Sequence, residues 1–192
     1  MTLILSIFCA SILAELPAVS VPDFTVTSSG VAGITSETTH EDLTDIFGTA
    51  NIEDTREHMG EGYYSEGTEI NSGSPFELAV IWAQENTPFT AASIMIRGYK
   101  VRTAEDIGIG STLTELEEII GEFEMSGFAW DYEGYVYLTG TIYENLYIRL
   151  TPTETSREEQ PELWRSLMGD DIFTSASMRE INPVVTDFRI LF

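Results

Sequence analysis

Cysteine is almost absent from this 192-residue chain, which contains a single one, Cys9. Cys9 lies in residues 3–14 (LILSIFCASILA), an uncharged and almost entirely apolar segment. The segment is too short to span a bilayer as a helix and has the length of a signal-peptide core. Small residues at Ala18 and Ser20 fit cleavage after Ser20, so we expect residues 1–20 to be a signal peptide. The alternative is a buried N-terminal strand or helix.

After such cleavage the chain would hold no cysteine, which excludes disulfides, thiolate metal sites and cysteine catalysis. Export without disulfides is typical of the bacterial periplasm or extracellular medium. The sequence therefore predicts an exported bacterial protein, periplasmic or extracellular.

Basic residues are also scarce: Lys and Arg number 9 against 32 Asp and Glu, and the net charge is −23. Removal of residues 1–20 deletes one acid, Glu15, and no base, which leaves −22. Binding to a phosphate backbone requires clustered cations, and no cluster is present. Nucleic acid and anionic membrane surfaces are thus poor partners. The acidity predicts a well-solvated surface, with a cationic partner or Ca²⁺ as the alternative.

Histidine occurs only at His40 and His58. His40 begins like a zinc-protease motif, but Thr44 stands where the second ligand should be. Glu57, His58 and Glu61 could bind a divalent metal, although their spacing matches no defined site. The sequence therefore predicts no metal, no cofactor and no catalytic residue.

Known catalytic motifs are missing too. The sequence contains no G-x-S-x-G nucleophile turn, no phosphate-binding glycine loop and no D-x-D-x-D-G calcium loop. A carboxylate pair for glycoside cleavage is not excluded, because the chain holds many acids.

One segment of the sequence is repeated. Residues 34–48 and 107–121 share five identities in fifteen positions: Ile34/Ile107, Thr39/Thr112, Leu43/Leu116, Ile46/Ile119 and Gly48/Gly121. Both copies carry an S/T-x-x-D/E capping pattern and a closing glycine, so each predicts a short helix, over about 39–47 and 112–120. In the second copy Leu113, Leu116, Ile119 and Ile120 share the apolar face, and the glutamates should point to water. The repeat predicts two tandem units, residues 21–103 and 104–192.

Short apolar runs predict the strands that would cover these helices. Residues 76–83 and 91–99 should form an antiparallel hairpin around a turn at 84–89, and 135–138 should pair likewise with 146–151. Residues 184–192 predict a closing strand and 123–131 a further one; 161–168 predict a helix ended by Gly169. Residues 51–73 are polar and glycine-rich and predict a long loop. Together these patterns indicate an α+β fold with antiparallel sheet.

Residues 127–134 (GFAWDYEG) are the densest candidate for a binding site. Trp130 and Tyr132 could stack on a sugar or an aromatic side chain while Asp131 and Glu133 accept hydrogen bonds. The favoured interpretation is structural: strand alternation would send Phe128, Trp130 and Tyr132 into the core beneath the second helix, with the two carboxylates facing water. Trp82 would do the same in the first unit.

The run GIGSTLTELEEIIGEFEMSGFAWDYEGYV resembles a motif of uncharacterised bacterial envelope proteins, in which a helix is followed by Gly-Phe-x-Trp-Asp-Tyr-x-Gly. LTDIFGTANIEDTREHMGEG and NPVVTDFRILF are similar to other parts of that family, so the resemblance covers most of residues 33–192. Ile120-Gly121-Glu122 departs from it, since Asn-Gly-Lys or Asn-Gly-Arg is usual there. The repeat is more loosely similar to β-lactamase-inhibitor-protein-like and outer-membrane-assembly-lipoprotein-like domains. These resemblances imply small binding or scaffold modules, often in tandem, and no catalytic residues.

The sequence thus predicts an exported, non-catalytic binding or scaffold module of the bacterial envelope, with a protein or surface polymer as partner. The alternatives are a carboxylate-dependent hydrolase that uses Asp131 and Glu133, and a secreted structural protein stabilised by Ca²⁺.

Overall fold

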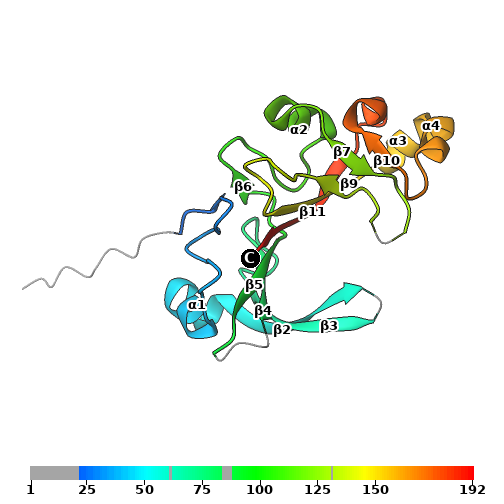
Figure 1. Cartoon of the computed structure of the whole chain (residues 1–192). Helices are drawn as coiled ribbons and strands as arrows, with labels where there is room; N and C mark the ends of the chain where they lie inside the picture. The colour runs from blue at the N-terminus through cyan, green and yellow to red at the C-terminus, as the bar shows by residue number, and fades with distance from the viewer. Residues whose placement is uncertain (1–21, 61, 84–87, 131) are drawn as a thin grey trace, which may run out of the picture.

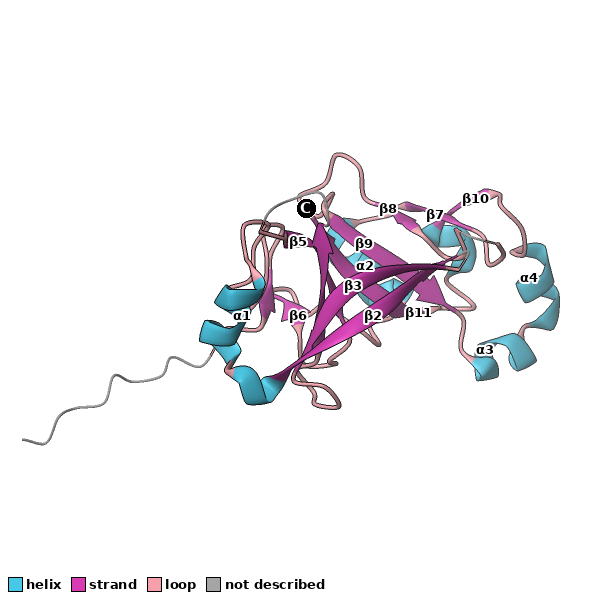
Figure 2. Ribbon diagram, turned by 90° about the horizontal axis from the view of Figure 1, so that it is seen from below, coloured by secondary structure: helices cyan, strands magenta, loops and turns pink. Residues whose placement is uncertain are grey.

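The computed structural model describes residues 22–60, 62–83, 88–130 and 132–192, and within them the fold is α+β. A six-stranded antiparallel sheet forms its centre (Figures 1 and 2). In spatial order its strands are β2 (Ile52–Gly60), β3 (Tyr63–Ile70), β4 (Leu78–Ala83), β5 (Thr90–Ile96), β11 (Val184–Leu191) and β9 (Leu146–Thr151).

Two small sheets flank this centre. One is antiparallel, with the order β10 (Ile172–Thr174), β7 (Glu124–Ser126) and β8 (Val136–Tyr137); the other is a parallel pair of β1 (Thr25–Val26) and β6 (Arg102–Thr103). The α-helices are α1 (His40–Phe47), α2 (Leu113–Ile120), α3 (Glu154–Glu159) and α4 (Pro161–Ser166), with 3₁₀ turns η1 (Thr49–Asn51) and η2 (Ser175–Met178). No helix in the described ranges is long and apolar enough to cross a membrane.

The two repeated segments form α1 and α2 as predicted, and their ends explain why. In α1 the Thr39 hydroxyl accepts from the Asp42 amide at 3.3 Å, and the Asp42 carboxylate accepts from the Thr39 amide at 2.8 Å. Thr112 and Glu115 make the same reciprocal pair in α2, at 3.2 and 2.7 Å. Each pair satisfies backbone N–H groups that a helix start leaves free, so local sequence fixes where each helix begins.

The apolar face of α2 differs in part from the prediction. Leu113 and Leu116 are buried and Ile120 is partly buried, but Ile119 is 40% exposed. Glu117, expected to face water, instead accepts hydrogen bonds from Ser175 and from Arg179, whose Nε lies 2.7 Å from its carboxylate. The helix is therefore fixed on two sides, by leucines on the core and by Glu117 on η2.

Glu117 supports a prediction about pH. The hydrogen bond from Arg179 is the main reason that the pKa of Glu117 lies below its ordinary value of 4.5. A carboxyl whose pKa is lowered by folding stabilises the fold above its unfolded-state pKa and loses this effect as pH falls through the folded-state pKa. We therefore expect Glu117→Gln to cost stability at pH 7, with the deficit shrinking once the pH drops below 4.5. Urea denaturation of both proteins at pH 7 and at pH 3 measures this, and a constant deficit would contradict it.

The β4–β5 antiparallel hairpin is confirmed, although its turn residues 84–87 fall outside the described ranges. The helix at 161–168 and the strands at 146–151 and 184–192 are confirmed with small changes at their ends. The pairing of 135–138 with 146–151 is wrong: β8 pairs with β7, β9 pairs with β11, and only an isolated bridge joins Tyr135 to Arg149.

The prediction of a loop over 51–73 is also wrong, because β2 and β3 form an antiparallel hairpin there, with a register shift between His58 and Gly60. The strands lack the usual apolar alternation since β2 is an edge strand and one face of the hairpin is charged. Arg56 pairs with Glu66 across it at 3.1 Å, and Gly60 and Gly62 take positive φ at its tip. Polar cross-strand pairs thus replace the apolar pattern that normally reveals a strand.

The two halves of the chain share one sheet, because β5 of the first half pairs with β11 of the second. One apolar cluster contains Leu43 from α1 and Leu116 from α2. The division into tandem units at residue 103 stays a prediction. Residues 1–20, the predicted signal peptide, lie outside the described ranges.

Candidate binding cleft

The central sheet is strongly curved toward the face opposite its apolar core. Arg97, directly after β5, reaches Glu57 on β2, with an Nη2–carboxylate distance of 2.6 Å. Two strands, β3 and β4, lie between, so this contact links β2 to the end of β5 across the face of the sheet. Figure 1 shows the β2–β3 hairpin and the β9–β11 end of the sheet extending from β4 and β5 in the same direction.

A cleft of about 560 Å³ lies between these two ends. The tip of the hairpin contributes one wall, the loop after β7 contributes another, and β9 and β11 each contribute an arginine. The lining residues are His58, Met59, Gly60, Tyr63, Trp130, Tyr132, Arg149 and Arg189. The volume is that of an ordinary small-molecule site.

Three aromatic side chains on the cleft walls are largely exposed: Tyr63 at 71%, Trp130 at 75% and Tyr132 at 67%. Within the described part of the chain, none of these rings contacts another ring. Their faces are therefore accessible to a ligand. Exposed large aromatics gathered around a hollow mark a binding surface more often than isolated ones do.

The loop that carries Trp130 and Tyr132 is closed by one backbone hydrogen bond and held to β9 by another. The Gly134 amide donates to the Gly127 carbonyl, and the Leu150 amide donates to the Gly134 carbonyl, both at 2.9 Å. Gly134 has φ of 66°, and a Cβ there would lie 1.9 Å from the Leu150 carbonyl oxygen. Only glycine permits this approach, so the loop is anchored at a defined point of the sheet.

This loop corrects the favoured interpretation of residues 127–134. Phe128 is buried as predicted, but β7 ends at Ser126 and the chain then turns, with Trp130 at φ 64°. Trp130 and Tyr132 therefore point away from the core instead of packing beneath α2. Trp82 is buried, and its indole N–H donates to the Thr68 hydroxyl at 3.1 Å.

Arg189 is held firmly in the cleft. Asp187 accepts from its Nε at 2.8 Å and from its Nη2 at 2.5 Å, and the guanidinium lies 5.1 Å from the centre of the Tyr147 ring. The hydrogen bonds to Asp187 raise the pKa of Arg189, so the group is always charged and paired. Its role here is to form a rigid floor.

Arg149 is held differently. Its Nε donates to the backbone carbonyl of Glu133 at 2.8 Å, while its Nη2 is 3.9 Å from the Glu133 carboxylate, beyond hydrogen-bond distance. The side chain is about three-quarters buried. The orientation of Arg149 is therefore fixed through Nε at the lining of the cleft, and no carboxylate of the described residues lies within hydrogen-bond distance of its terminal N–H groups.

The predicted site residues thus fall into three groups. Trp130 and Tyr132 line the cleft, Glu133 positions Arg149 at its edge, and Asp131 lies outside the described ranges. Sequence reasoning missed Tyr63, Arg149 and Arg189. A signal existed for Arg149: in Leu146–Thr151 the apolar residues alternate with Tyr147, Arg149 and Thr151, which places these three on the face opposite the core.

The two histidines have different surroundings, and Glu61 of the predicted Glu57, His58 and Glu61 metal site lies outside the described ranges. The Nε2 atom of His40 lies 3.0 Å from the Oδ1 atom of Asp54, and the His58 ring packs edge-on against the Tyr64 ring with centroids 5.1 Å apart. Glu57 is bound to Arg97. In the described ranges, no group of three or more His, Asp, Glu or Cys side chains is arranged to hold a metal ion.

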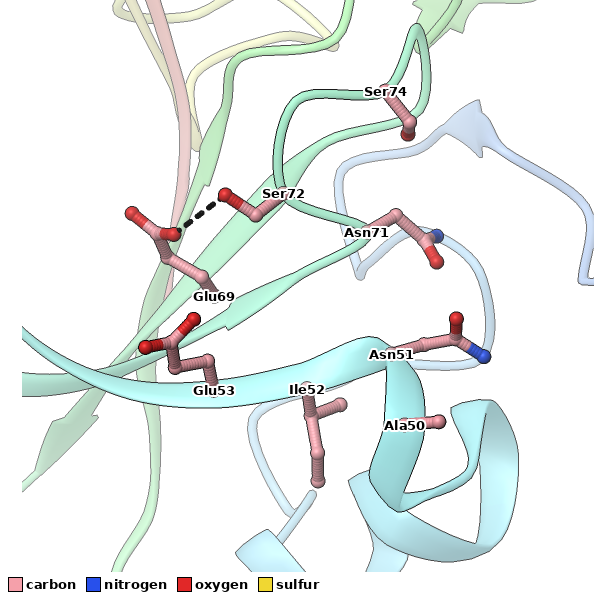
Figure 3. A pocket seen from close by; sticks show the side chains of 8 residues that line it. All are labelled: Ala50, Asn51, Ile52, Glu53, Glu69, Asn71, Ser72 and Ser74. Atoms are coloured by element: carbon pink, nitrogen blue, oxygen red, sulfur yellow. Dashed lines mark hydrogen bonds between the residues drawn. The ribbon is translucent and has the colours of Figure 1, made fainter.

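A second hollow of about 300 Å³ is rich in oxygen atoms (Figure 3). Glu53 and Glu69 face one another across β2 and β3, and Asn51 and Asn71 lie beside them. Figure 3 shows the two carboxylates on one side and the two amides pointing to the other, so these oxygens do not surround one point. Glu69 already binds Arg97 at 2.7 Å and Ser72 at 2.9 Å.

No protein-family model, curated protein or solved structure matches this chain. The resemblance to envelope proteins with a Gly-Phe-x-Trp-Asp-Tyr-x-Gly motif stays a prediction, and the cleft is interpreted from its own geometry.

Proposed function

We propose that this protein is an exported, non-catalytic binding module of the bacterial envelope that holds a surface polymer or protein segment in the cleft between the β2–β3 hairpin and the 127–134 loop. One observation carries the proposal: Tyr63, Trp130 and Tyr132 expose rings that contact no other ring of the described residues, around a hollow that two ordered arginines also line. Aromatic and arginine side chains are the residues that contribute most to binding energy at recognition surfaces.

The anchoring of these side chains also supports binding. Gly134 and Glu133 fix the loop and Arg149, and the Asp187 carboxylate fixes Arg189. Side chains ordered before a ligand arrives lose little conformational entropy when it binds. The hydrolase alternative has no comparable support, since the Glu133 carboxylate lies 3.9 Å from Arg149 Nη2 and Asp131 lies outside the described ranges.

Intrinsic fluorescence tests the proposal directly, because Trp130 is the tryptophan that lines the cleft, while Trp82 is buried and Trp164 packs partly buried against the core. A panel of soluble bacterial surface-polysaccharide fragments and envelope peptides is titrated into the protein. We expect at least one to give a saturable blue shift from Trp130. Trp130→Ala combined with Tyr132→Ala should weaken its binding at least tenfold, measured by calorimetry.

The control is Tyr99→Ala, which removes an aromatic ring that is 59% exposed and does not line the cleft. Its affinity should equal that of the unmodified protein. Absence of saturable binding by the whole panel, or equal binding by the double variant, would disprove the proposal.

A further inference from the structure

The arginines of this acidic chain are almost all matched with carboxylates. Among the described residues, six of the eight have a carboxylate oxygen within 3.4 Å: Arg56, Arg97, Arg102, Arg165, Arg179 and Arg189. Arg149 and Arg157 are the exceptions. With 32 acids available for 9 bases, an arginine without a close carboxylate is an informative departure.

Arg157 has another explanation. Its Nε and Nη2 donate to the Pro152 carbonyl at 3.2 and 3.0 Å, and its guanidinium lies 5.0 Å from the centre of the Trp164 ring. Through these contacts Arg157, which lies on α3, links the end of β9 to α4. Among the described residues, Arg149 makes a hydrogen bond through Nε alone, to the Glu133 carbonyl, and the Glu133 carboxylate lies 3.9 Å from its Nη2.

The planar terminal N–H groups of arginine bind a carboxylate through two parallel hydrogen bonds. Such bonds are stronger where water is partly excluded, and the Arg149 side chain is only 28% exposed. The neighbouring Arg189 is already neutralised by Asp187. The cleft therefore offers one recognition point for a single carboxylate.

The aromatic side chains on the walls of the cleft add a second requirement for the ligand. Trp130 and Tyr132 present ring faces, which stack against flat apolar surfaces such as the C–H face of a sugar ring. The cleft volume of about 560 Å³ suits one or a few rings and is small for a folded partner. A ligand with a flat C–H face and a carboxylate satisfies both features.

We propose that the cleft binds a carboxylate-bearing sugar, such as a uronic acid unit of an acidic polysaccharide. Its ring stacks on Trp130 or Tyr132, and its carboxylate accepts two hydrogen bonds from the terminal nitrogens of Arg149. This inference rests on the proposed binding function and specifies its ligand. The net charge of −23 does not prevent local binding, because repulsion from distant charges is screened beyond about 8 Å at physiological salt.

The test uses calorimetry with three probes: trigalacturonate, its fully methyl-esterified form, and a short blocked peptide with one glutamate. The ester keeps the sugar rings and removes the charge. We expect trigalacturonate to bind at least tenfold more tightly than the ester. Arg149→Gln should abolish this preference while leaving the ester's affinity unchanged, and Trp130→Ala should weaken both sugars.

Arg165→Gln is the matched control, since it removes the same charge from an exposed arginine outside the cleft. Arg149→Lys, which keeps the charge without the planar geometry, should retain an intermediate preference. Should Arg149→Gln fail to fold, the acid-to-ester comparison on the unmodified protein still decides the question.

Equal binding of the acid and the ester would overturn the carboxylate inference and leave the binding function standing. Tighter binding of the glutamate peptide than of either sugar would replace the sugar with an acidic peptide. Absence of binding by all three probes would reject this inference alone, while the fluorescence panel would still decide the function.

Discussion

Arg97→Met is expected to lower the free energy of unfolding by about 2–4 kcal/mol, because it leaves largely buried carboxylates without their partner. The carboxylates of Glu57 and Glu69 lie 2.6 and 2.7 Å from the terminal nitrogens of Arg97. The Glu77 carboxylate lies 3.6 Å from the same guanidinium group. Arg97 thus connects β2, β3 and the start of β4. Urea denaturation followed by circular dichroism measures the loss.

Arg165→Met is the control for the loss of Arg97. Its pair with Glu162 is exposed on both sides, and such pairs contribute about 0–1 kcal/mol. A second variant, Arg97→Met with Glu57→Met, should recover part of the loss because one unpaired charge is removed as well. If Arg97→Met cost no stability beyond that of the control, Arg97 would not be what holds the sheet in its curved shape.

The same substitution should affect the cleft. Glu57 is next to His58, which lines the cleft at the hairpin tip. When Arg97 no longer holds Glu57, the hairpin has fewer contacts that curve it toward β9 and β11. The consequence is that the cleft should bind its ligand more weakly even though Arg97 is not among the residues that line it.

Leu116→Ala is expected to destabilise the protein by about 2–5 kcal/mol, the usual range for a fully buried leucine. Leu116 is 1% exposed on the core-facing side of α2. There it lies beside Ile107, Leu146 and Ile148. Truncation would leave a cavity between the helix and the sheet that these neighbours fill only in part. Thermal and urea unfolding measure the change.

Glu118→Ala provides the comparison on the same helix, since Glu118 is exposed and alanine is a good helix former. It should change stability by less than about 0.5 kcal/mol, as surface substitutions usually do. A loss below about 1 kcal/mol for Leu116→Ala would mean that α2 does not carry the core contact assigned to it.

How far the sequence predicts this fold depends on the range of each signal. Thr39 with Asp42, and Thr112 with Glu115, satisfy free amides three residues away, so both helix starts could be predicted without knowledge of the rest. The apolar runs of β4, β9 and β11 were equally clear. The β2–β3 hairpin was not, because its stability comes from a ladder and ion pairs that polar residues make across strands.

The candidate site shows the same limit. The composition of residues 127–134 drew attention to Trp130 and Tyr132, but alternation placed them in the core, on the wrong side. The close approach of Gly134 to Leu150 turns the loop outward instead. Nothing in the residues near Trp130 indicates that Tyr63 or Arg149 lies across from it.

By itself the sequence determined the α+β class, the two capped helices and most core strands, because these follow from contacts within a few residues and from the alternation of apolar side chains. Tertiary structure alone decided the curvature of the sheet and, with it, the cleft. Arg97 and Glu57 are 40 positions apart in the chain, and the looser pairing of Arg149, whose nearest described carboxylate is 3.9 Å from Nη2, is visible only in the folded protein.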